Sequence, residues 1–415
     1  METSNDKQLL IVGAGHAGSE LAIAARNGGW SGGITLLWDE TALPYHRPPL
    51  SKAYLAGKAD AESLALRPRS SYDDAKVTLR PGARMQSIDR GNRRVTLADG
   101  TVLPYDKLAL CTGGRPRPLA CSGLPAGGAA NLLYLRTLAD AEGIRLRLVA
   151  GSRLVVIGGG YIGLEVAASA RAIGAEVTLL EAQPRVLARV AGAEISAFYE
   201  SVHRDAGVDL RTGVLVEAVE MAGDQIVTVL CAGGERVPAD LVVAGLGMLV
   251  NVEAAQAAGI ATEAGIPVDE RACTADTDIV AAGDCTLQQS AHYARELRLE
   301  SVPNALEQAR AAAAWLCGKP KPAAGIPWFW SDQYDLKLQM AGLSQGHDRC
   351  ILRGDPARRS FSAFYLQGNR LLAIDAVNRP AEFMLAKRLL GPGCVADPER
   401  LADETVPLKD LLAQA

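Results

Sequence analysis

Two glycine-rich loops are the part of this chain whose residue types and spacing most directly imply chemistry. Both have the pattern GxGxxG, formed by Gly13, Gly15 and Gly18 and by Gly158, Gly160 and Gly163. Each loop follows an apolar run and precedes an alanine-rich stretch of helical character. In that setting the glycines let the backbone approach a dinucleotide pyrophosphate, which lies at the N-terminus of the helix. The sequence therefore predicts two dinucleotide-binding sites.

The two loops belong to a repeated unit. The segment QLLIVGAGHAGSELAIAA, which starts at Gln8, matches RLVVIGGGYIGLEVAASA, which starts at Arg153. Further along, DGTVLPYDKLALCTGG, ending at Gly114, matches GGERVPADLVVAGLG, ending at Gly247, and both predict a hairpin followed by a buried strand. Apolar runs that alternate with helical stretches predict parallel sheets with βαβ crossovers. We therefore expect two doubly wound α/β halves.

The strands that would position these loops can be placed along the chain. Buried strands are expected at 9–12 and 34–37 in the first half, and at 154–157 and 177–180 in the second. A last strand is expected in IPVDERACTADTDIVAAGDC, where it leads into Gly283 and Asp284. After the Pro- and Gly-rich stretch GKPKPAAGIP, the sequence becomes aromatic and rich in strand-forming residues. A third, α+β domain is expected there.

Composition disfavours several other classes of protein. The length of 415 residues predicts two or three domains, and the formal net charge of −4 disfavours nucleic acid or an anionic membrane surface as a partner. No apolar run reaches the roughly 20 residues of a membrane-spanning helix. The 8 cysteines are scattered without the spacing of zinc or redox pairs, so no metal site is predicted. We expect a soluble, cytoplasmic protein.

The second loop is followed by an acidic residue at the spacing expected for a nicotinamide dinucleotide. Glu181 ends the next predicted strand, 181 − 158 = 23 residues after Gly158. A carboxylate there accepts hydrogen bonds from the ribose hydroxyls and repels a 2′-phosphate, so the sequence favours NADH over NADPH. Arg185 and Arg189 lie just downstream and would weaken that preference. A plain surface charge is the alternative interpretation of Glu181.

Further motifs, in order along the chain, identify a family. The segments LPYHRPPLSK, LALCTGGRPRPL, GGGYIGLE, ESVPNALEQAR, PWFWSDQY and VNRPAEF resemble the FAD- and NADH-dependent ferredoxin reductases of oxygenase systems. The resemblance implies two doubly wound, Rossmann-like dinucleotide-binding domains of the glutathione-reductase type and a C-terminal α+β domain. It implies a discontinuous FAD-binding domain at 1–114 and 247–325, an NAD-binding domain at 115–246 and a C-terminal domain at 326–415.

The resemblance also assigns roles to individual residues. Lys52 and Glu165 are implied to pair beside the flavin, although a glutamate in the first turn of a helix often only complements the helix dipole. Trp330 and Val302 are implied to approach the flavin ring, with a core tryptophan as the alternative for Trp330. Trp38 stands where a ribose-binding acid is usual, which leaves Asp39 as the candidate. The cofactor-binding residues expected in all are Gly13, Gly15, Ala17, Gly18, Asp39, Arg47, Lys52, Thr112, Gly113, Arg115, Arg136, Gly158, Gly160, Gly163, Glu181, Asp284, Val302 and Trp330.

The class of electron acceptor is narrowed by an absent cysteine. Disulfide reductases of similar fold carry a cysteine pair after the second strand, and related NADH oxidases and peroxidases carry one; this sequence has LPYHRPPLSKAYL there. Transfer of single electrons to a two-iron two-sulfur ferredoxin, supplying a cytochrome P-450 or related oxygenase, is therefore the leading hypothesis. An NADH oxidase or a quinone or dye reductase is the enzymic alternative. A redox interaction protein resembling apoptosis-inducing factor is the non-enzymic one.

Docking of an acidic ferredoxin onto a net acidic protein requires a local positive patch. Arg310, Lys387 and Arg388 are the candidate residues. A solvated helix face explains Lys387 and Arg388 nearly as well.

Overall fold

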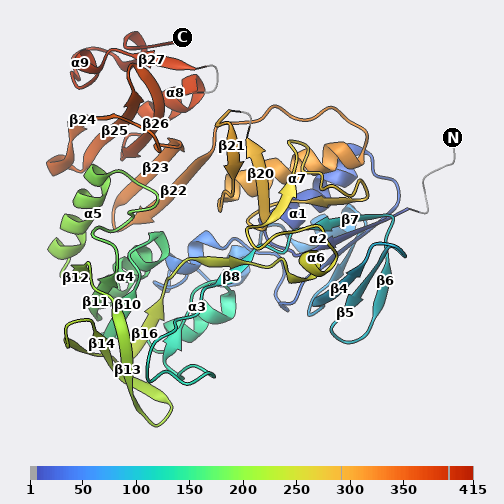
Figure 1. Cartoon of the computed structure of the whole chain (residues 1–415), viewed down its shortest axis with the longest axis horizontal. Helices are drawn as coiled ribbons and strands as arrows, with labels where there is room; N and C mark the ends of the chain where they lie inside the picture. Colours follow the sequence, from blue (N-terminus) through green and yellow to red (C-terminus); the bar gives the residue numbers. More distant parts are fainter. Residues whose placement is uncertain (1–6, 291, 391–392, 415) are drawn as a thin grey trace. The chain divides into compact units, whose positions relative to one another are not determined.

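The structure is a computed structural model that describes residues 7–290, 292–390 and 393–414 (Figure 1). The chain divides into two compact units. The first comprises Met1–His46, Glu62–Arg115 and Met248–Gly325; the second comprises Arg47–Ala61, Pro116–Gly247 and Ile326–Ala415. Residues 47–61, which lie inside the predicted FAD-binding segment 1–114, thus belong to the second unit. The predicted NAD-binding and C-terminal domains fall within one unit, and the division into three domains stays a prediction.

A parallel sheet carries the glycine loop of the first unit. Its strands lie in the order β19-β7-β1-β2-β3, with parallel pairing throughout. They are β1 (Gln8–Val12), β2 (Gly33–Leu37), β3 (Val77–Arg80), β7 (Lys107–Leu110) and β19 (Ile279–Ala281). Strands buried on both faces are apolar along their length, and all of β1 except Gln8 is buried. The strands predicted at 9–12, at 34–37 and before Asp284 are confirmed.

Two alanine-rich helices pack together in the first unit. They are α1 (His16–Gly28) and α7 (Val302–Leu316), which lie beside each other in Figure 1. Ala22 and Ala25 of α1 and Ala309 and Ala312 of α7 belong to one buried cluster, and such small side chains let two helix backbones approach closely. The other elements are η3 (Glu62–Leu64), α2 (Arg69–Asp74), the antiparallel β4 (Met85–Asp89), β5 (Arg94–Leu97) and β6 (Val102–Pro104), α6 (Glu253–Ala257), β18 (Ile266–Val268), β20 (Thr286–Ser290) and β21 (Arg295–Leu297), and the pair β8 (Gly114–Pro116) and β17 (Met248–Val250).

The second unit repeats this plan around its own glycine loop. Its parallel strands lie in the order β12-β11-β10-β16-β9. They are β9 (Leu132–Leu133), β10 (Arg153–Ile157), β11 (Glu176–Glu181), β12 (Asp209–Thr212) and β16 (Leu241–Ala244). The helices are α3 (Leu138–Arg145), α4 (Tyr161–Ile173) and α5 (Ala193–Asp205), and an antiparallel sheet follows with β13 (Val216–Ala222), β14 (Gln225–Cys231) and β15 (Arg236–Pro238). The internal repeat and the doubly wound fold predicted from it are confirmed.

The second unit also contains the aromatic C-terminal region, which forms an antiparallel sheet with helices. The strands lie in the order β22-β23-β26-β25-β24, with β27 paired to β26 and to β28. They are β22 (Trp328–Gln333), β23 (Leu336–Gly342), β24 (Arg349–Asp355), β25 (Ser360–Gln367), β26 (Arg370–Val377), β27 (Cys394–Ala396) and β28 (Leu412–Gln414), and short η4 (Pro356–Arg358), α8 (Pro380–Leu390), α9 (Pro398–Leu401) and η5 (Leu408–Asp410) complete it. The predicted α+β character is confirmed.

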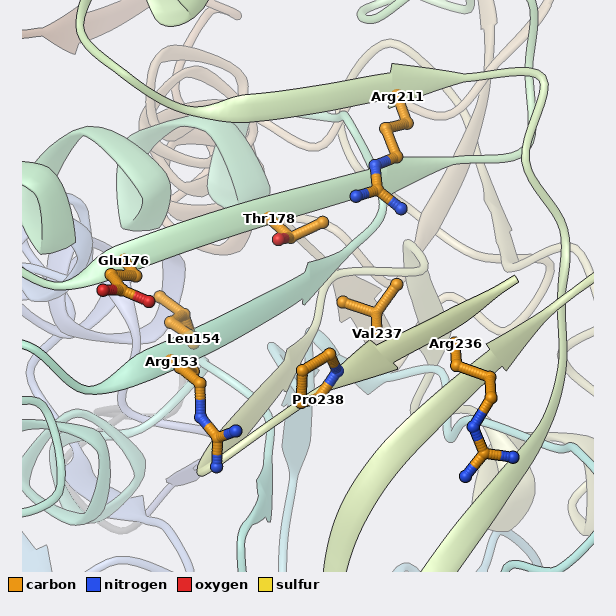
Figure 2. A pocket seen from close by; sticks show the side chains of 8 residues that line it. All are labelled: Arg153, Leu154, Glu176, Thr178, Arg211, Arg236, Val237 and Pro238. Atoms are coloured by element: carbon orange, nitrogen blue, oxygen red, sulfur yellow. The ribbon is translucent and has the colours of Figure 1, made fainter.

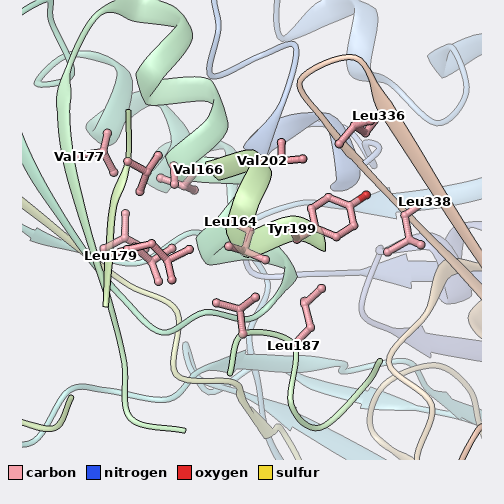
Figure 3. Close-up of a cluster of buried hydrophobic side chains, with 14 of the residues drawn as sticks. Leu164, Val166, Val177, Leu179, Leu187, Tyr199, Val202, Leu336 and Leu338 are labelled. Carbon is pink, nitrogen blue, oxygen red and sulfur yellow. The ribbon is translucent and has the colours of Figure 1, made fainter. Parts of the chain in front are cut away.

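One apolar core joins the parallel sheet of the second unit to the C-terminal sheet. Figure 3 shows Tyr199 of α5 between Leu164 of α4 and Leu338 of β23. Leu179 of β11 and Leu336 of β23 belong to the same buried cluster. Because this core is shared, the two regions form one compact unit even though the sequence predicts them as separate domains.

A buried carboxylate lies in the C-terminal sheet. Asp375, in β26, is 4% exposed and accepts a 2.8 Å hydrogen bond from the hydroxyl of Tyr365. The Tyr365 oxygen in turn accepts one from the Gly192 amide at 3.2 Å. Burial raises the pKa of Asp375 to about 7, with a further rise from the charge of Glu194, and the Tyr365 hydrogen bond only partly offsets this. The folded state therefore holds a proton on Asp375 that the unfolded chain releases near its ordinary pKa of 3.8.

We predict that this carboxyl makes the protein less stable as the pH rises. A group whose pKa is raised on folding stabilises the fold fully below its unfolded pKa, and this contribution is lost as the pH rises through about 7. Asp375→Asn, which stays neutral and keeps an acceptor for Tyr365, should abolish most of that loss, roughly 2–4 kcal/mol between pH 5 and pH 8. Urea unfolding at the two pH values measures it. Asp410→Asn, at an exposed position, is the matched control; equal pH dependence of Asp375→Asn and the wild type would contradict the prediction.

Candidate functional site

The glycine loop of the first unit joins β1 to α1 by close backbone contacts. Gly13 has a φ of +99°, and a Cβ added to it would lie 2.2 Å from the carbonyl oxygen of Cys111. A Cβ added to Gly18 would lie 1.8 Å from the carbonyl oxygen of Gly13. A Cβ on Gly15, which caps α1, would meet nothing within 4 Å. The loop is thus closed against its own unit and open at the helix N-terminus, which fits a dinucleotide pyrophosphate there.

The loop of the second unit has the same construction. A Cβ added to Gly158 would lie 2.4 Å from the carbonyl oxygen of Gly245, and one added to Gly163 would lie 2.0 Å from that of Gly158. Gly160, the cap of α4, is again open. Both loops therefore fit the dinucleotide fingerprint at the level of individual backbone atoms.

Glu181 lies directly beside the second loop, at the end of β11. One carboxylate oxygen accepts a hydrogen bond of 2.5 Å from the Gly159 amide, and the other accepts one of 2.7 Å from the Gln183 amide. Arg185 donates hydrogen bonds to the Ala191 carbonyl at 2.8 Å and to the Ser196 hydroxyl at 2.6 Å, so its guanidinium group is already engaged within the unit. The acid therefore lies beside the second loop, where the spacing predicts a ribose-binding carboxylate, and that role stays a prediction.

The corresponding acid of the first unit is not identified by any contact. Trp38 is buried and donates a 3.0 Å hydrogen bond from its indole nitrogen to the Ala42 carbonyl. Asp39 is exposed, and the following Glu40 accepts the Tyr45 hydroxyl at 2.5 Å. The assignment of Asp39 to the FAD ribose stays a prediction.

Two further side chains form hydrogen bonds at the edge of the first sheet. Neither is among the residues predicted from the sequence. The side-chain nitrogen of Asn251 donates to the backbone carbonyl of Thr112 at 3.0 Å, and the side-chain oxygen of Asn251 accepts from Arg115 at 2.7 Å. Gln308 of α7 accepts from the Gly283 amide at 2.8 Å, beside Asp284. Gln308 lies inside the motif ESVPNALEQAR, so its position in a recognised segment is the signal that could have found it.

The predicted residues Thr112, Gly113, Asp284 and Val302 all belong to the first unit. Thr112 donates its hydroxyl to the Asn251 carbonyl at 2.6 Å, Gly113 has a φ of +60°, and Val302 is the first residue of α7. Ala17 is buried in α1. Their roles toward FAD stay predictions.

The segment 47–61 brings two predicted cations into the second unit. A short 3₁₀ helix, η2 (Pro48–Ser51), is set by its two prolines and places Arg47 at one end and Lys52 at the other. Arg47 donates to the carbonyl oxygen of Arg136 at 2.6 Å. Arg47 and Arg136, both expected to bind a cofactor, are therefore neighbours.

Lys52 and Glu165 form an ion pair within the second unit. Their Nζ and Oε2 atoms are 2.6 Å apart, and the Glu165 side chain is 2% exposed. Ser51 donates to the same carboxylate oxygen at 2.5 Å, and Ser331 of β22 donates to the other at 2.6 Å. Glu165 is consequently held by three residues, which a residue that merely complements the helix dipole does not require. The sequence reasoning missed Ser51 and Ser331, which no pattern distinguishes.

Trp330 lies on β22, one residue before Ser331. Its ring is half-buried, 5.5 Å from the ring of Trp328 and 6.1 Å from that of Phe329. Among the described residues, the apolar clusters include Trp328 and Phe329 but not Trp330. This favours a role at a surface of the unit over a core role, and its contact with the flavin stays a prediction.

The three candidate docking residues differ in their surroundings. Arg310 is paired with Glu20 at 2.7 Å, and Glu20 also pairs with Arg67 at 2.7 Å. Burial alone would raise the pKa of Glu20, but hydrogen bonds from Arg310 and Arg67 outweigh it and lower the pKa. Lys387 lies 4.2 Å from the centre of the Trp328 ring, and Arg388 is exposed. Arg310 therefore serves the fold of the first unit as well as any docking surface.

A pocket of about 130 Å³ is lined by the first residues of β10 and β11, whereas the glycine loop follows the last residue of β10. Figure 2 shows its arginines around Val237 and Pro238. Each arginine is paired: Arg153 with Asp240 at 2.5 Å, Arg211 with Glu235 at 2.7 Å, and Arg236 with Glu220. The pocket is thus no part of the candidate site.

Within the described ranges, no group of acidic, histidine and cysteine side chains is arranged to hold a metal ion, and no helix has the length and apolarity to cross a membrane.

Comparison with known proteins assigns the fold and the site to a family. Residues 7–309 match the pyridine nucleotide-disulphide oxidoreductase model and residues 328–412 match the reductase C-terminal model. This chain belongs to the pyridine nucleotide-disulphide oxidoreductase family. Members use FAD and a nicotinamide dinucleotide, which the two loops fit.

Individual relatives match over almost their full length. The chain is 53% identical to putidaredoxin reductase CamA of Pseudomonas putida, over 99% of this chain and 98% of the relative. The solved structure of a covalent putidaredoxin reductase–putidaredoxin complex superposes with a TM-score of 0.95 at 52% identity, covering 98% of each chain. That of the ferredoxin reductase for the CYP199A2 system from Rhodopseudomonas palustris gives 0.94 at 45% identity, covering 99% of this chain and 100% of the other. The predicted family resemblance is confirmed.

We predict that Glu181 sets the choice of nicotinamide dinucleotide. Wild-type kcat/KM with ferricyanide should be higher for NADH than for NADPH, and Glu181→Gln should lose at least about tenfold of that ratio because it no longer repels a 2′-phosphate. The glutamine keeps an acceptor for the Gly159 amide, so the loop stays in place. Glu181→Ala, which removes that acceptor too, separates charge from loop geometry. Equal efficiency of the wild type with both dinucleotides would refute the assignment.

Proposed function

We propose that this protein is an FAD-containing NADH:ferredoxin oxidoreductase that passes single electrons to a two-iron two-sulfur ferredoxin of a cytochrome P-450 or related oxygenase system. The observation that carries the proposal is the full-length match to putidaredoxin reductase, whose fold has been solved in a covalent complex with putidaredoxin. We further propose that it works in the cytoplasm. All eight cysteines are free thiols, which fits a reducing compartment.

The environment of the cysteines supports electron transfer over thiol chemistry. Cys111 and Cys285, the buried cysteines nearest the first glycine loop and Asp284, both have a pKa raised by burial. A thiol must ionise to attack a disulfide or a peroxide, so neither is suited to do so. No cysteine occurs in segment 47–61. The acceptor is therefore proposed to take electrons without a protein thiol.

FAD supplies the conversion of a two-electron hydride into single electrons when it is bound. The residues proposed to hold it are the first glycine loop, Arg47, Asp284 and the segment around Thr112. The second loop and Glu181 are proposed to hold NADH. Lys52 is proposed to present its positive charge where electron density accumulates, and Glu165 to hold that ammonium group in place.

Reduction of a protein acceptor distinguishes the proposed function from its rivals. The purified FAD-loaded protein should reduce putidaredoxin with NADH faster than it consumes oxygen with NADH alone, and added salt should slow the reaction by screening the docking charges. An oxygen rate equal to the putidaredoxin rate would favour an NADH oxidase, and stimulation by quinone alone would favour a quinone reductase. Slow NADH oxidation with every acceptor would favour a redox interaction protein.

The same assay locates the proposed docking surface. Arg388→Glu is the variant to use, because Arg310→Glu would place a second carboxylate beside the buried Glu20 and disturb the fold. Arg388→Glu should raise the KM for putidaredoxin and leave ferricyanide reduction unchanged. Arg370→Glu, an exposed residue of the same sheet and helix region, is the matched control. An unchanged KM in Arg388→Glu would exclude this surface.

Lys52→Met tests the proposed role of the ion pair. Stopped-flow reduction of the bound flavin by saturating NADH should slow by at least about tenfold, because one preorganised positive charge is lost at the reacting centre. Lys58→Met removes an exposed lysine of the same segment and should have the wild-type rate. If Lys52→Met retains FAD and is reduced as fast as the wild type, Lys52 is only structural.

A further inference from the structure

The carboxylate of Glu165 is the end of a longer line of polar side chains. Ser331 donates to it at 2.6 Å, and Gln333 donates from its side-chain nitrogen to the Ser331 hydroxyl at 3.1 Å. The carbonyl oxygen of Gln333 lies 2.8 Å from Nε2 of His203, and Nδ1 of His203 lies 3.1 Å from the Tyr334 hydroxyl. Ser331, Gln333 and His203 are at most 2% exposed. The line runs from Glu165 on α4, through β22, to His203 on α5 and the turn after β22.

The charge on Glu165 fixes the direction of every hydrogen bond in this line. An ionised carboxylate only accepts, so Ser331 must donate its hydroxyl proton to it. With that proton used, Ser331 can only accept from Gln333, which therefore presents its amide nitrogen to Ser331 and its carbonyl oxygen to His203. His203 must then carry its proton on Nε2, and its bare Nδ1 accepts from Tyr334. All four donors point toward Glu165.

The protonation states of the other members agree with this direction. Burial lowers the pKa of His203 to about 4, with the Gln333 hydrogen bond only partly opposing it, so the ring is neutral near pH 7 and has one donor and one acceptor nitrogen. Burial also raises the pKa of Tyr334, which keeps its hydroxyl as a donor. Tyr161 and Tyr199, which also sense the charge of Glu165, have raised pKa values through burial and stay neutral. Lys52 is the cation paired with Glu165 in the described part of the unit.

The backbone at the far end of the line is held in an unfavourable conformation. Tyr334 begins the two-residue turn between β22 and β23 with a φ of +57°, a region that two-residue turns usually assign to glycine or asparagine. Its ring contacts His203 edge to face with 5.1 Å between the ring centres. A bulky residue persists in such a turn when its side chain makes compensating contacts. The contact with His203 supplies them.

We propose that Ser331, Gln333, His203 and Tyr334 are positioning residues that hold the Glu165 carboxylate aimed at Lys52. Aligned donors polarise one another, so a chain that ends on an anion stabilises it more than one hydroxyl would. The inference rests on the role of the Lys52–Glu165 pair in the proposed function. A polar network that only satisfies buried groups is the competing interpretation; it has the same direction, but it predicts that flavin reduction does not depend on His203.

The tautomer of His203 tests the direction without any turnover. Nitrogen-15 spectra of histidine-labelled, FAD-loaded protein should show His203 protonated on Nε2, with the signal assigned by its loss in His203→Phe. In Glu165→Gln, Lys52 and Ser51 still donate to one end of the side chain, so the glutamine carbonyl oxygen faces them and its amide nitrogen faces Ser331. Each hydrogen bond along the line then reverses, and His203 should be protonated on Nδ1 instead. The same tautomer in both proteins would overturn the proposal.

Flavin reduction tests the consequence for the reaction. His203→Phe should slow reduction by saturating NADH by about threefold to tenfold, the effect of losing one hydrogen bond between neutral groups, while the Kd for NADH stays the same. His203→Gln keeps an N–H donor and should recover most of the rate. If His203 were merely structural, His203→Phe and His203→Gln would have the same rate of flavin reduction. His347→Phe, at an exposed histidine of the same unit, is the control. A wild-type rate in His203→Phe would overturn the proposal.

The proposed role of the ion pair and the proposed role of the positioning residues can be refuted separately. If Lys52→Met is reduced at the wild-type rate, the proposed role of the ion pair is wrong whatever His203 does. If Lys52→Met is slow but the His203 tautomer does not change in Glu165→Gln, the ion pair acts as proposed and the line of positioning residues does not. Should His203→Phe fail to fold, Tyr334→Phe removes only the outermost hydrogen bond and should still slow reduction about twofold to threefold. An unchanged rate in Tyr334→Phe, together with the same His203 tautomer in the wild type and in Glu165→Gln, rejects the inference.

Discussion

A carboxylate removed from water must be given partners, and in the second unit this requirement falls on Glu165. Leaving it unpaired would cost several kcal/mol, a large part of the stability of a typical domain. Its partners come from separate stretches of chain: Lys52 and Ser51 from segment 47–61, and Ser331 from β22. This explains why segment 47–61 belongs to the second unit although β2 and β3 of the first unit flank it in sequence. It also ties the C-terminal sheet to α4 by a polar contact, beside the apolar core that the two share.

The repeated glycine loop shows how much of the fold is imposed by steric exclusion. In both units the first glycine lies against the carbonyl oxygen of the residue that follows a neighbouring strand, and the last glycine lies against the carbonyl oxygen of the first. The middle glycine is open in both. A side chain at the outer positions would push the helix away from the strand that precedes it, so the helix N-terminus could not lie at the sheet edge. The same constraint appears twice because the same backbone path is used twice, and it was readable from the sequence for that reason.

Local patterns therefore predicted the parallel strands, the repeat and Glu181, because each depends on neighbours along the chain or on a fixed spacing. The pairing of Lys52 with Glu165 came only from the family resemblance, since the two are far apart in sequence and no periodicity joins them. Ser51, Ser331 and His203 were missed because serine and histidine acquire their role only from what tertiary structure places beside them. Arg310 looked like a free surface charge, yet its pairing with Glu20 depends on the contact between α1 and α7. The shared core of the second unit was missed because apolar residues do not specify which sheet they will meet.

The composition of the line behind Glu165 has a physical reason beyond satisfying buried groups. A second cation next to Glu165 would stabilise the carboxylate more strongly than a serine, but it would also repel Lys52 and compete for the oxygen that the ammonium group contacts. Neutral dipoles avoid both effects, because they stabilise the anion without adding charge. The Ser331 hydroxyl takes one carboxylate oxygen and leaves the other to Lys52 and Ser51. The pair thus remains a single positive and a single negative charge, as the proposed role of Lys52 toward the flavin requires.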